Sequence, residues 1–246
     1  MNNPLISIVI PMLNESEIIV SKLKALQPLR RHCELIVVDG GSQDNSQSLA
    51  SPWVDYVLEA PAGRARQMNA GAAIAIADLL LFLHIDTELP DNLLELLPVV
   101  DNANGKSTND KRSNGHNREY WGRFDVVITG NHWMLPCIAF FMNKRSRITG
   151  IATGDQAMFI SRKLFAGVGG FPDQPLMEDI ALSTQLLKFF RPHCLASTAT
   201  TSGRRWEQKG VFRTICLMWS LRLAYWLGAP PSTLAKRYGY PVEGAS

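Results

Sequence analysis

Cysteine is scarce in this sequence and is not arranged for disulfides or for zinc. The 246 residues include four cysteines, which lie far apart and form no Cys-x-x-Cys pair: Cys33, Cys137, Cys194 and Cys216. This spacing excludes a disulfide framework and the common zinc-ligand patterns. We therefore expect reduced thiols in a cytoplasmic protein.

Targeting and membrane-spanning segments are also lacking. Residues 1–4 show neither a basic region nor a small-residue cleavage site, so we expect no signal peptide. The apolar stretch 211–227 is too short for a transmembrane helix, and Arg213 and Arg222 make it too charged.

Glycine is missing where two common nucleotide-binding enzyme classes need it. A Rossmann oxidoreductase carries Gly-x-Gly-x-x-Gly directly after its first strand, whereas residues 11–14 here are Pro-Met-Leu-Asn. A nucleotidyltransferase would have a glycine-rich, basic loop at the same place, and that loop is absent too. Both classes are therefore disfavoured.

Short apolar runs rich in β-branched residues alternate with helical segments. The expected strands are 5–10, 35–38 and 79–83, and the expected helices between them are 15–26 and 64–77. Because the strands are apolar on both faces, the pattern predicts a mostly parallel sheet with helices on both faces. The length suits one large core, so we predict a single α/β domain.

Two segments depart from this alternation. Residues 101–119 contain a single apolar residue, Ala103, and are predicted to be a flexible insertion. Residues 207–246 are predicted to be a helical C-terminal extension, which leaves 1–206 as the α/β domain.

Three polar side chains each follow a different predicted strand. In a parallel sheet the ligand lies beyond the carboxyl ends of the strands, so Asn14, Asp39 and Asp86 should meet at one edge. A nucleotide diphosphate needs a hard cation, and Asp86 suits that role. The alternative for Asp86 is a turn or helix-capping aspartate.

The order of these motifs resembles family 2 glycosyltransferases with the GT-A fold. The resemblance rests on the motifs Ser7–Glu15, Val37–Asp44, Asn69–Gly71, Phe82–Asp86 and Gly169–Phe171 followed by Met177–Asp179. It extends over about 5–206. Residues 154–157, 175–179 and 204–207 are further similar to a bacterial subgroup labelled radical-SAM/selenodomain-associated, or arsenosugar-biosynthesis, glycosyltransferases.

The resemblance implies a donor site for a nucleotide-diphosphate sugar. Asp86 would bind Mn²⁺ or Mg²⁺, and Asp39 the base or ribose. His84 stands where the family has the first acid of Asp-x-Asp, so it would ligate the metal, bond a ribose hydroxyl, or simply pack at a strand end. The implied nucleotide-sugar-binding residues are Pro11, Asn14, Glu15, Asp39, Arg64, Arg66, Asn69, His84 and Asp86.

Glu178 and Asp179 match the acceptor-side acids of the family. The resemblance implies that Asp179 is the general base of an inverting transfer and that Glu178 supports it. The alternative is that both acids only favour a helix N-terminus. The residues expected on the acceptor or diphosphate side are Gly154, Asp155, Arg204, Arg205 and Trp206.

Two apolar segments with basic residues, 134–147 and 211–227, leave three alternatives open. They could rest on an anionic membrane surface and deliver a lipid-linked acceptor, or form a homodimer interface, or lie in the protein's own core. Of these, we favour the core or the dimer interface over the membrane surface.

The function expected is therefore a metal-dependent glycosyltransferase that uses a nucleotide-diphosphate sugar and a small-molecule or lipid-linked acceptor. We expect no nucleic-acid partner, and a location in the cytoplasm or at the inner face of the membrane. The alternative is a non-catalytic protein that keeps the GT-A fold and binds the nucleotide-sugar.

Overall fold

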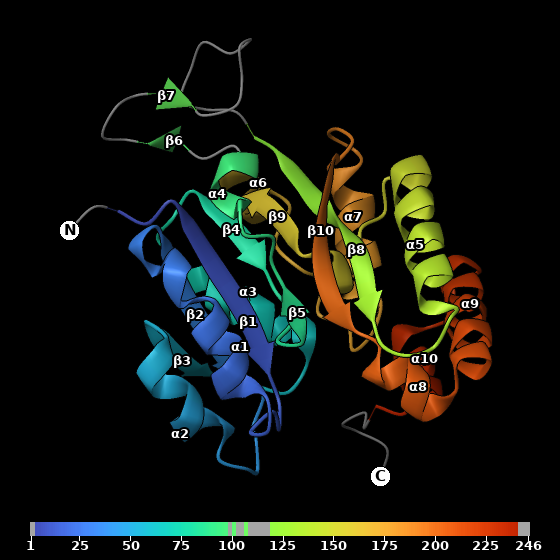
Figure 1. Cartoon of the computed structure of the whole chain (residues 1–246). Coiled ribbons are helices and arrows are strands. Elements are labelled where there is room, and N and C mark those ends of the chain that lie inside the picture. Colours follow the sequence, from blue (N-terminus) through green and yellow to red (C-terminus); the bar gives the residue numbers. More distant parts are fainter. Residues whose placement is uncertain (1–2, 98–99, 102–105, 108–118, 241–246) are drawn as a thin grey trace.

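One eight-stranded sheet organises the protein. The computed structural model describes residues 3–97, 100–101, 106–107 and 119–240. The strands lie in the order β3-β2-β1-β4-β9-β8-β10-β5 (Figure 1). Their bounds are β1 Ile6–Met12, β2 Cys33–Asp39, β3 Tyr56–Glu59, β4 Leu79–Phe82, β5 Thr87–Glu88, β8 Trp121–Thr129, β9 Met158–Ser161 and β10 His193–Ser202. Outside this sheet, β6 Val100–Asp101 pairs with β7 Lys106–Ser107.

Most neighbouring strands run parallel, as predicted. The strands β3, β2, β1 and β4 are parallel to one another, and β10 is parallel to β8. The pairs that involve β9, and the pair of β10 with β5, are antiparallel. Since Met12 lies opposite Asp39 and Val9 lies opposite Phe82, the carboxyl ends of β1, β2 and β4 share one edge.

Helices cover both faces of the sheet. Their bounds are α1 Ile19–Ala25, α2 Ser46–Ala50, α3 Arg64–Ile74, α4 Leu93–Leu96, α5 Leu135–Thr149, α6 Arg162–Gly167, α7 Glu178–Leu186, α8 Arg204–Lys209, α9 Val211–Trp226 and α10 Pro231–Tyr238, with single 3-10 turns η1 Gln27–Arg31, η2 Ser51–Trp53 and η3 Gly154–Gln156.

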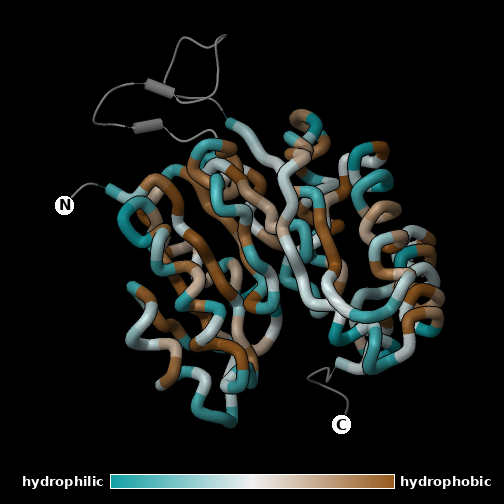
Figure 2. The backbone as a smooth tube through the Cα atoms, in the orientation of Figure 1, coloured by the Kyte–Doolittle hydropathy of each residue, from teal (hydrophilic) through white to brown (hydrophobic). Residues whose placement is uncertain are grey.

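Alternation along the central strands divides the core into two layers. Ile8 and Ile10 of β1 pack in the layer that contains Leu23 of α1, whereas Val9 packs with Met68 of α3 and with α7 on the other face. Successive side chains of a strand point to opposite faces, so strands buried on both faces must be apolar throughout. The central strands are accordingly brown in Figure 2.

Three predicted boundaries differ from the structure or fall outside it. The first helix begins at Ile19 rather than at residue 15, because Asn14 has a φ of 54° and does not cap it. The predicted boundary at 206/207 falls within α8, and the division into domain and extension stays a prediction. Most of the predicted insertion 101–119 lies outside the described residues.

Core burial, one of the alternatives for 134–147 and 211–227, is found on only one side of α5 and of α9. Their inner sides pack together through Ile138, Ala139 and Val211. Their outer sides expose large apolar groups, and Trp219 and Trp226 are 73% and 80% exposed. Within the described ranges, no helix is long and apolar enough to cross a membrane.

Close packing of α3 on the sheet gives a test of the fold. A Cβ at Gly71 would lie 2.4 Å from Cγ1 of Val9, so Gly71→Ala should lower the free energy of unfolding by about 1–3 kcal/mol, despite the higher helix propensity of alanine. Urea denaturation measures this difference. Gly167→Ala is the control, because a Cβ there meets no atom within 4 Å and should cause no loss. Equal losses in both variants would contradict the packing.

Candidate functional site

The loops after β1 and β2 are fastened together at the carboxyl edge of the sheet. The backbone N–H of Gln43 donates to Oδ1 of Asn14 (2.8 Å), and the N–H of Asn14 donates to Oγ of Ser42 (2.8 Å). These bonds hold Asn14 in its left-handed conformation and place Glu15 at the edge of the sheet.

Glu15 and Asp86 come together at this edge, although they follow different strands. Burial and the negative charge of Asp86 raise the pKa of Glu15, while Arg204 and Arg64 oppose that rise. Asp86 is half-buried, and its carboxylate accepts a long hydrogen bond of 3.5 Å from the Thr87 hydroxyl. Glu15 and Asp86, two of the residues implied for the donor side, are therefore close enough to interact electrostatically.

This pair of carboxylates is chemically suited to a divalent cation. Two neighbouring carboxylates that repel each other and have few donors are stabilised by a hard metal ion, which also accepts phosphate and water oxygens as ligands. In the described part of the chain, no group of three or more His, Cys, Asp or Glu side chains forms a complete cage. The arrangement fits an ion that is held by one or two carboxylates and by the diphosphate.

Asp39 lies where it was predicted, but its carboxylate is already engaged. It accepts hydrogen bonds from the N–H groups of Gly41 (3.2 Å) and Ser42 (3.0 Å), and from the hydroxyl of Ser42. Its role in binding a base or ribose stays a prediction.

His84 contacts the loop that leads to the acceptor-side acids. Its Nδ1 lies 3.3 Å from Oδ1 of Asp155, and a Cβ on Gly154 would lie 2.2 Å from Cε1 of the ring. Burial opposes the charge of Asp155, but the His84 hydrogen bond, with Arg64 and Arg205, lowers its pKa overall. His84 thus joins the donor side to Asp155, and a side chain at position 154 would displace the His84 ring.

The same loop holds Asp179. The N–H of Gly154 donates to Oδ2 of Asp179 (3.1 Å), and Oδ1 accepts from the N–H of Ile180 (2.7 Å). Glu178 beside it is buried, and burial together with the Asp179 charge raises its pKa to about 7, against the opposing effects of Arg64 and His84. The structure therefore brings both predicted acids to the site.

Backbone strain is concentrated around this site. Within the described ranges, the non-glycine residues with positive φ are Asn14 (54°), Ala157 (45°) and Met177 (67°). They flank Glu15, the loop of Gly154, and Glu178 respectively. Such conformations cost free energy and tend to persist where function requires them.

The C-terminal helix adds residues that the sequence analysis missed. Arg205 stacks on Tyr238 at 4.5 Å, and Tyr238 makes an edge contact with Tyr240 at 4.9 Å. Although burial disfavours its charge, Tyr240, Glu178, Tyr238 and Asp155 raise the pKa of Arg64. Arg64 therefore lies among carboxylates and tyrosines from the far end of the chain, which no local motif indicates.

The other predicted residues have contacts of their own within the protein or lie at its surface. Both polar groups of the Asn69 side chain bond the backbone of Phe171 (2.8 and 2.9 Å), which ties α3 to the Gly-Gly-Phe segment. Arg66 forms an ion pair with Asp173 at 2.8 Å. Trp206 packs on the apolar layer below α5, and Arg204 is exposed. Pro11 is buried within β1.

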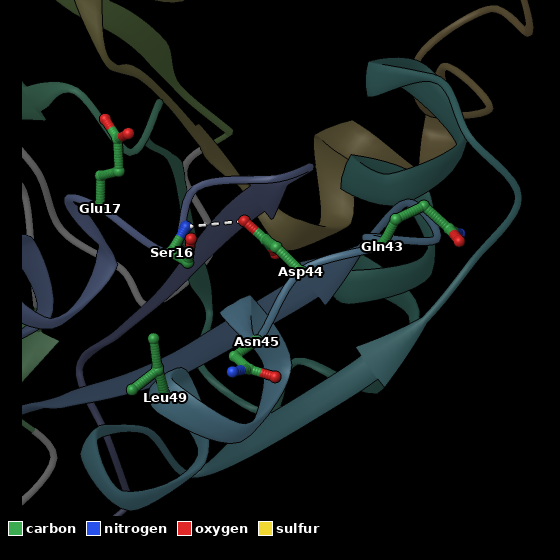
Figure 3. Close-up of a pocket in the computed structure, with 6 residues that line it drawn as sticks. All are labelled: Ser16, Glu17, Gln43, Asp44, Asn45 and Leu49. Carbon is green, nitrogen blue, oxygen red and sulfur yellow. Dashed lines mark hydrogen bonds between the residues drawn. The ribbon is translucent and has the colours of Figure 1, made fainter.

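An open pocket borders the donor side (Figure 3). Ser16, which follows Asn14 and Glu15 in the chain, lines this pocket, and its N–H donates a hydrogen bond to Asp44 (3.1 Å). Its lining residues are Ser16, Glu17, Gln43, Asp44, Asn45 and Leu49.

Comparison with known proteins decides the family. Residues 7–165, more than half of the chain, match the family described as Glycosyl transferase family 2. The chain belongs to that family. No curated protein sequence matches it significantly.

Solved glycosyltransferases share the fold of this family 2 chain. A mannosyltransferase from Pyrobaculum calidifontis, in complex with GDP-Man and Mn²⁺, has a TM-score of 0.56 at 20% identity, covering 80% of this chain and 56% of its own. TarS 1–349 of S. aureus with UDP-GlcNAc has a TM-score of 0.57 at 16% identity, covering 80% and 58%. The chain spans less than two thirds of either protein.

A third structure matches over nearly the whole chain. Glucosyl-3-phosphoglycerate synthase from Mycobacterium tuberculosis, in complex with Mn²⁺, UDP-glucose and phosphoglyceric acid, has a TM-score of 0.59 at 17% identity, and the match covers 99% of this chain and 82% of that one. At these identities the likeness establishes the fold. The predictions of a family 2 chain and of a GT-A-like α/β fold are confirmed.

The raised pKa of Glu178 predicts a pH-dependent stability. Between the ordinary pKa of 4.5 and about 7 the folded state binds more protons than the unfolded state, so stability falls as pH rises through this interval. Glu178→Gln removes the ionisable group and should be more stable than the wild type at pH 8, by up to about 3 kcal/mol, but not at pH 5. Urea unfolding at both pH values measures the difference.

The exposed Glu17 supplies the matched control for this comparison. The free energy of unfolding of Glu17→Gln should differ from that of the wild type by the same small amount at pH 5 and pH 8. If Glu178→Gln likewise changed the free energy of unfolding by the same amount at both pH values, the raised pKa of Glu178 would be contradicted.

Proposed function

We propose that this protein transfers a sugar from a nucleotide-diphosphate sugar to a hydroxyl acceptor, with inversion at the anomeric carbon. The observation that carries the proposal is the hydrogen-bonded loop 154–156, which joins His84 on the donor side to Asp179 in a family 2 fold. Support comes from relatives of the same fold that bind UDP- or GDP-sugars.

The residues divide into a donor side and an acceptor side. Asp86, with Glu15 beside it, would hold Mn²⁺ or Mg²⁺, and the ion would neutralise charge on the diphosphate. Arg64 and Arg205 supply positive charge near the departing diphosphate. Asp179 accepts the proton of the acceptor hydroxyl, because the N–H groups of Gly154 and Ile180 hold its carboxylate in place.

Several finer predictions belong to this proposal and stay predictions. They are membership of the radical-SAM/selenodomain-associated or arsenosugar subgroup, a small-molecule or lipid-linked acceptor, a cytoplasmic location, a homodimer, and contact of 134–147 and 211–227 with the inner face of the membrane. The exposed tryptophans of α9 favour a partner surface over core burial. The alternative function is a non-catalytic nucleotide-sugar-binding protein.

A thermal-shift measurement tests the donor site. One of UDP, GDP, CDP or dTDP should raise the melting temperature in the presence of Mn²⁺, because a ligand that binds only the folded state stabilises it. Asp86→Ala should abolish that shift. The exposed Asp91 provides a control, and Asp91→Asn should keep the full shift. The absence of a shift with all four diphosphates would overturn the proposal.

The assignment of Asp179 is tested by slow hydrolysis of the donor, in which water replaces the acceptor. Asp179→Asn should lower the rate of nucleoside diphosphate release by about 10²-fold or more, since general-base catalysis contributes about 10²–10⁴-fold. Binding of the diphosphate should stay as in the wild type. A wild-type protein that binds the donor and never turns it over would favour the binding protein.

A further inference from the structure

Two arginine side chains near Asp179 have buried nitrogen atoms without partners. Within the described residues, Nε and Nη2 of Arg145 and Nε of Arg222 are buried and make no hydrogen bond. Arginine keeps its charge in proteins, and burying an unpaired charged donor costs free energy. Such donors in a folded protein call for a ligand or a partner.

Packing places Arg222 at the start of α7. The preceding residue, Leu221, is fully buried and packs in one cluster with Leu176 and Met177. These two residues immediately precede Glu178 and Asp179. The apolar contact therefore fixes this turn of α9 against the acceptor-side acids.

Arg145 lies on α5, a helix that a neighbouring side chain joins to the loop of Gly154. Two residues before it, Oδ1 of Asn143 accepts a hydrogen bond from Nε2 of Gln156 (3.3 Å). Gln156 ends the turn that begins at Gly154, and the N–H of Gly154 donates to Asp179. The α5 helix is thus tied to the loop that positions Asp179.

Electrostatics agree with this placement. Burial and the positive charge of Arg222 lower the pKa of Arg145 to about 10, and Asp179 opposes that change. Burial likewise lowers the pKa of Arg222, against Asp179 and Asp155. The two guanidinium groups therefore repel each other and have Asp179 as the negative charge that they share.

The donor side has its own cations. The positive charges that act on Glu15 there belong to Arg204 and Arg64. The charge of Asp179 acts on Arg145 and Arg222 instead, which places both on the proposed acceptor side.

We propose that Arg145 and Arg222 bind a phosphate or carboxylate group of the acceptor, so that the acceptor is an anionic molecule whose hydroxyl lies beside Asp179. Planar guanidinium groups bind both oxyanions through paired hydrogen bonds. The acceptor oxygen forms the bond to the anomeric carbon, its proton passes to Asp179, and the bond to the donor diphosphate breaks with its electron pair. The inference rests on the proposed function.

Glycerol 3-phosphate is a suitable probe, and uncharged glycerol is its matched control. With Mn²⁺ and the preferred nucleoside diphosphate saturating the donor site, glycerol 3-phosphate should raise the melting temperature further. Glycerate tests in the same way whether the site binds a carboxylate. Arg145→Gln and Arg222→Gln should each raise the Kd for the probe about tenfold or more, whereas exposed Arg213→Gln should not change it.

Stability without the probe separates this site from a structural role. If the arginines only neutralise Asp179, both glutamine variants melt at lower temperatures and keep the wild-type Kd, which overturns the inference. If they form an anion site, both variants melt no lower than the wild type without probe, because two buried positive charges that repel each other are reduced to one. If the nucleoside diphosphate raises the melting temperature and neither glycerol 3-phosphate nor glycerate raises it further, the inference is also overturned. A missing diphosphate shift would instead be a failure of the proposed function.

A vesicle-binding experiment distinguishes an anion carried by a lipid from one carried by a soluble acceptor. Phosphatidylcholine vesicles with and without phosphatidic acid are sedimented with the wild type and with both glutamine variants. Binding that requires phosphatidic acid and is lost in both variants supports a lipid-borne phosphate. Glycerol 3-phosphate binding without such sedimentation supports a soluble phosphorylated or carboxylated acceptor.

Discussion

Two pairs of acids share the site, Glu15 with Asp86 and Glu178 with Asp179, and within each pair the carboxylates repel each other. Burial adds a second and larger penalty, because low polarity disfavours the charged form of an acid. The pKa values of Glu15 and Glu178 rise for this reason. Cations and N–H donors from distant parts of the chain must therefore converge on this site, and they do.

The positive charges are distributed over both sides of the site. Arg64 of α3 favours the charged forms of Glu15, Asp155 and Glu178, so its positive charge serves both the donor side and the acceptor side. On the acceptor side, Arg145 and Arg222 come from two helices that also carry exposed aromatic groups on their outer faces. The same two helices therefore contribute to the site on one face and present an apolar surface on the other.

Motifs next to strands were more predictable than isolated residues. Asn14, Asp39 and Asp86 were placed correctly because β-branched runs reveal buried strands, and the ends of parallel strands share an edge. Asn69 shows the limit of this reasoning, since no local motif indicates that its amide bonds the backbone of Phe171. Arg145 was grouped with cations for a membrane surface, yet its guanidinium nitrogens are buried.

The amino-acid sequence by itself determined the family, the alternation of strands and helices, and the position of the acids at strand and helix ends, because these follow from short-range patterns. Only the tertiary structure decided that Tyr238, Arg145 and Arg222 belong beside those acids. Their placement depends on how α5, α9 and α10 pack against α7 and the sheet. Such packing joins residues that are far apart in the chain, and it leaves no periodic trace in the sequence.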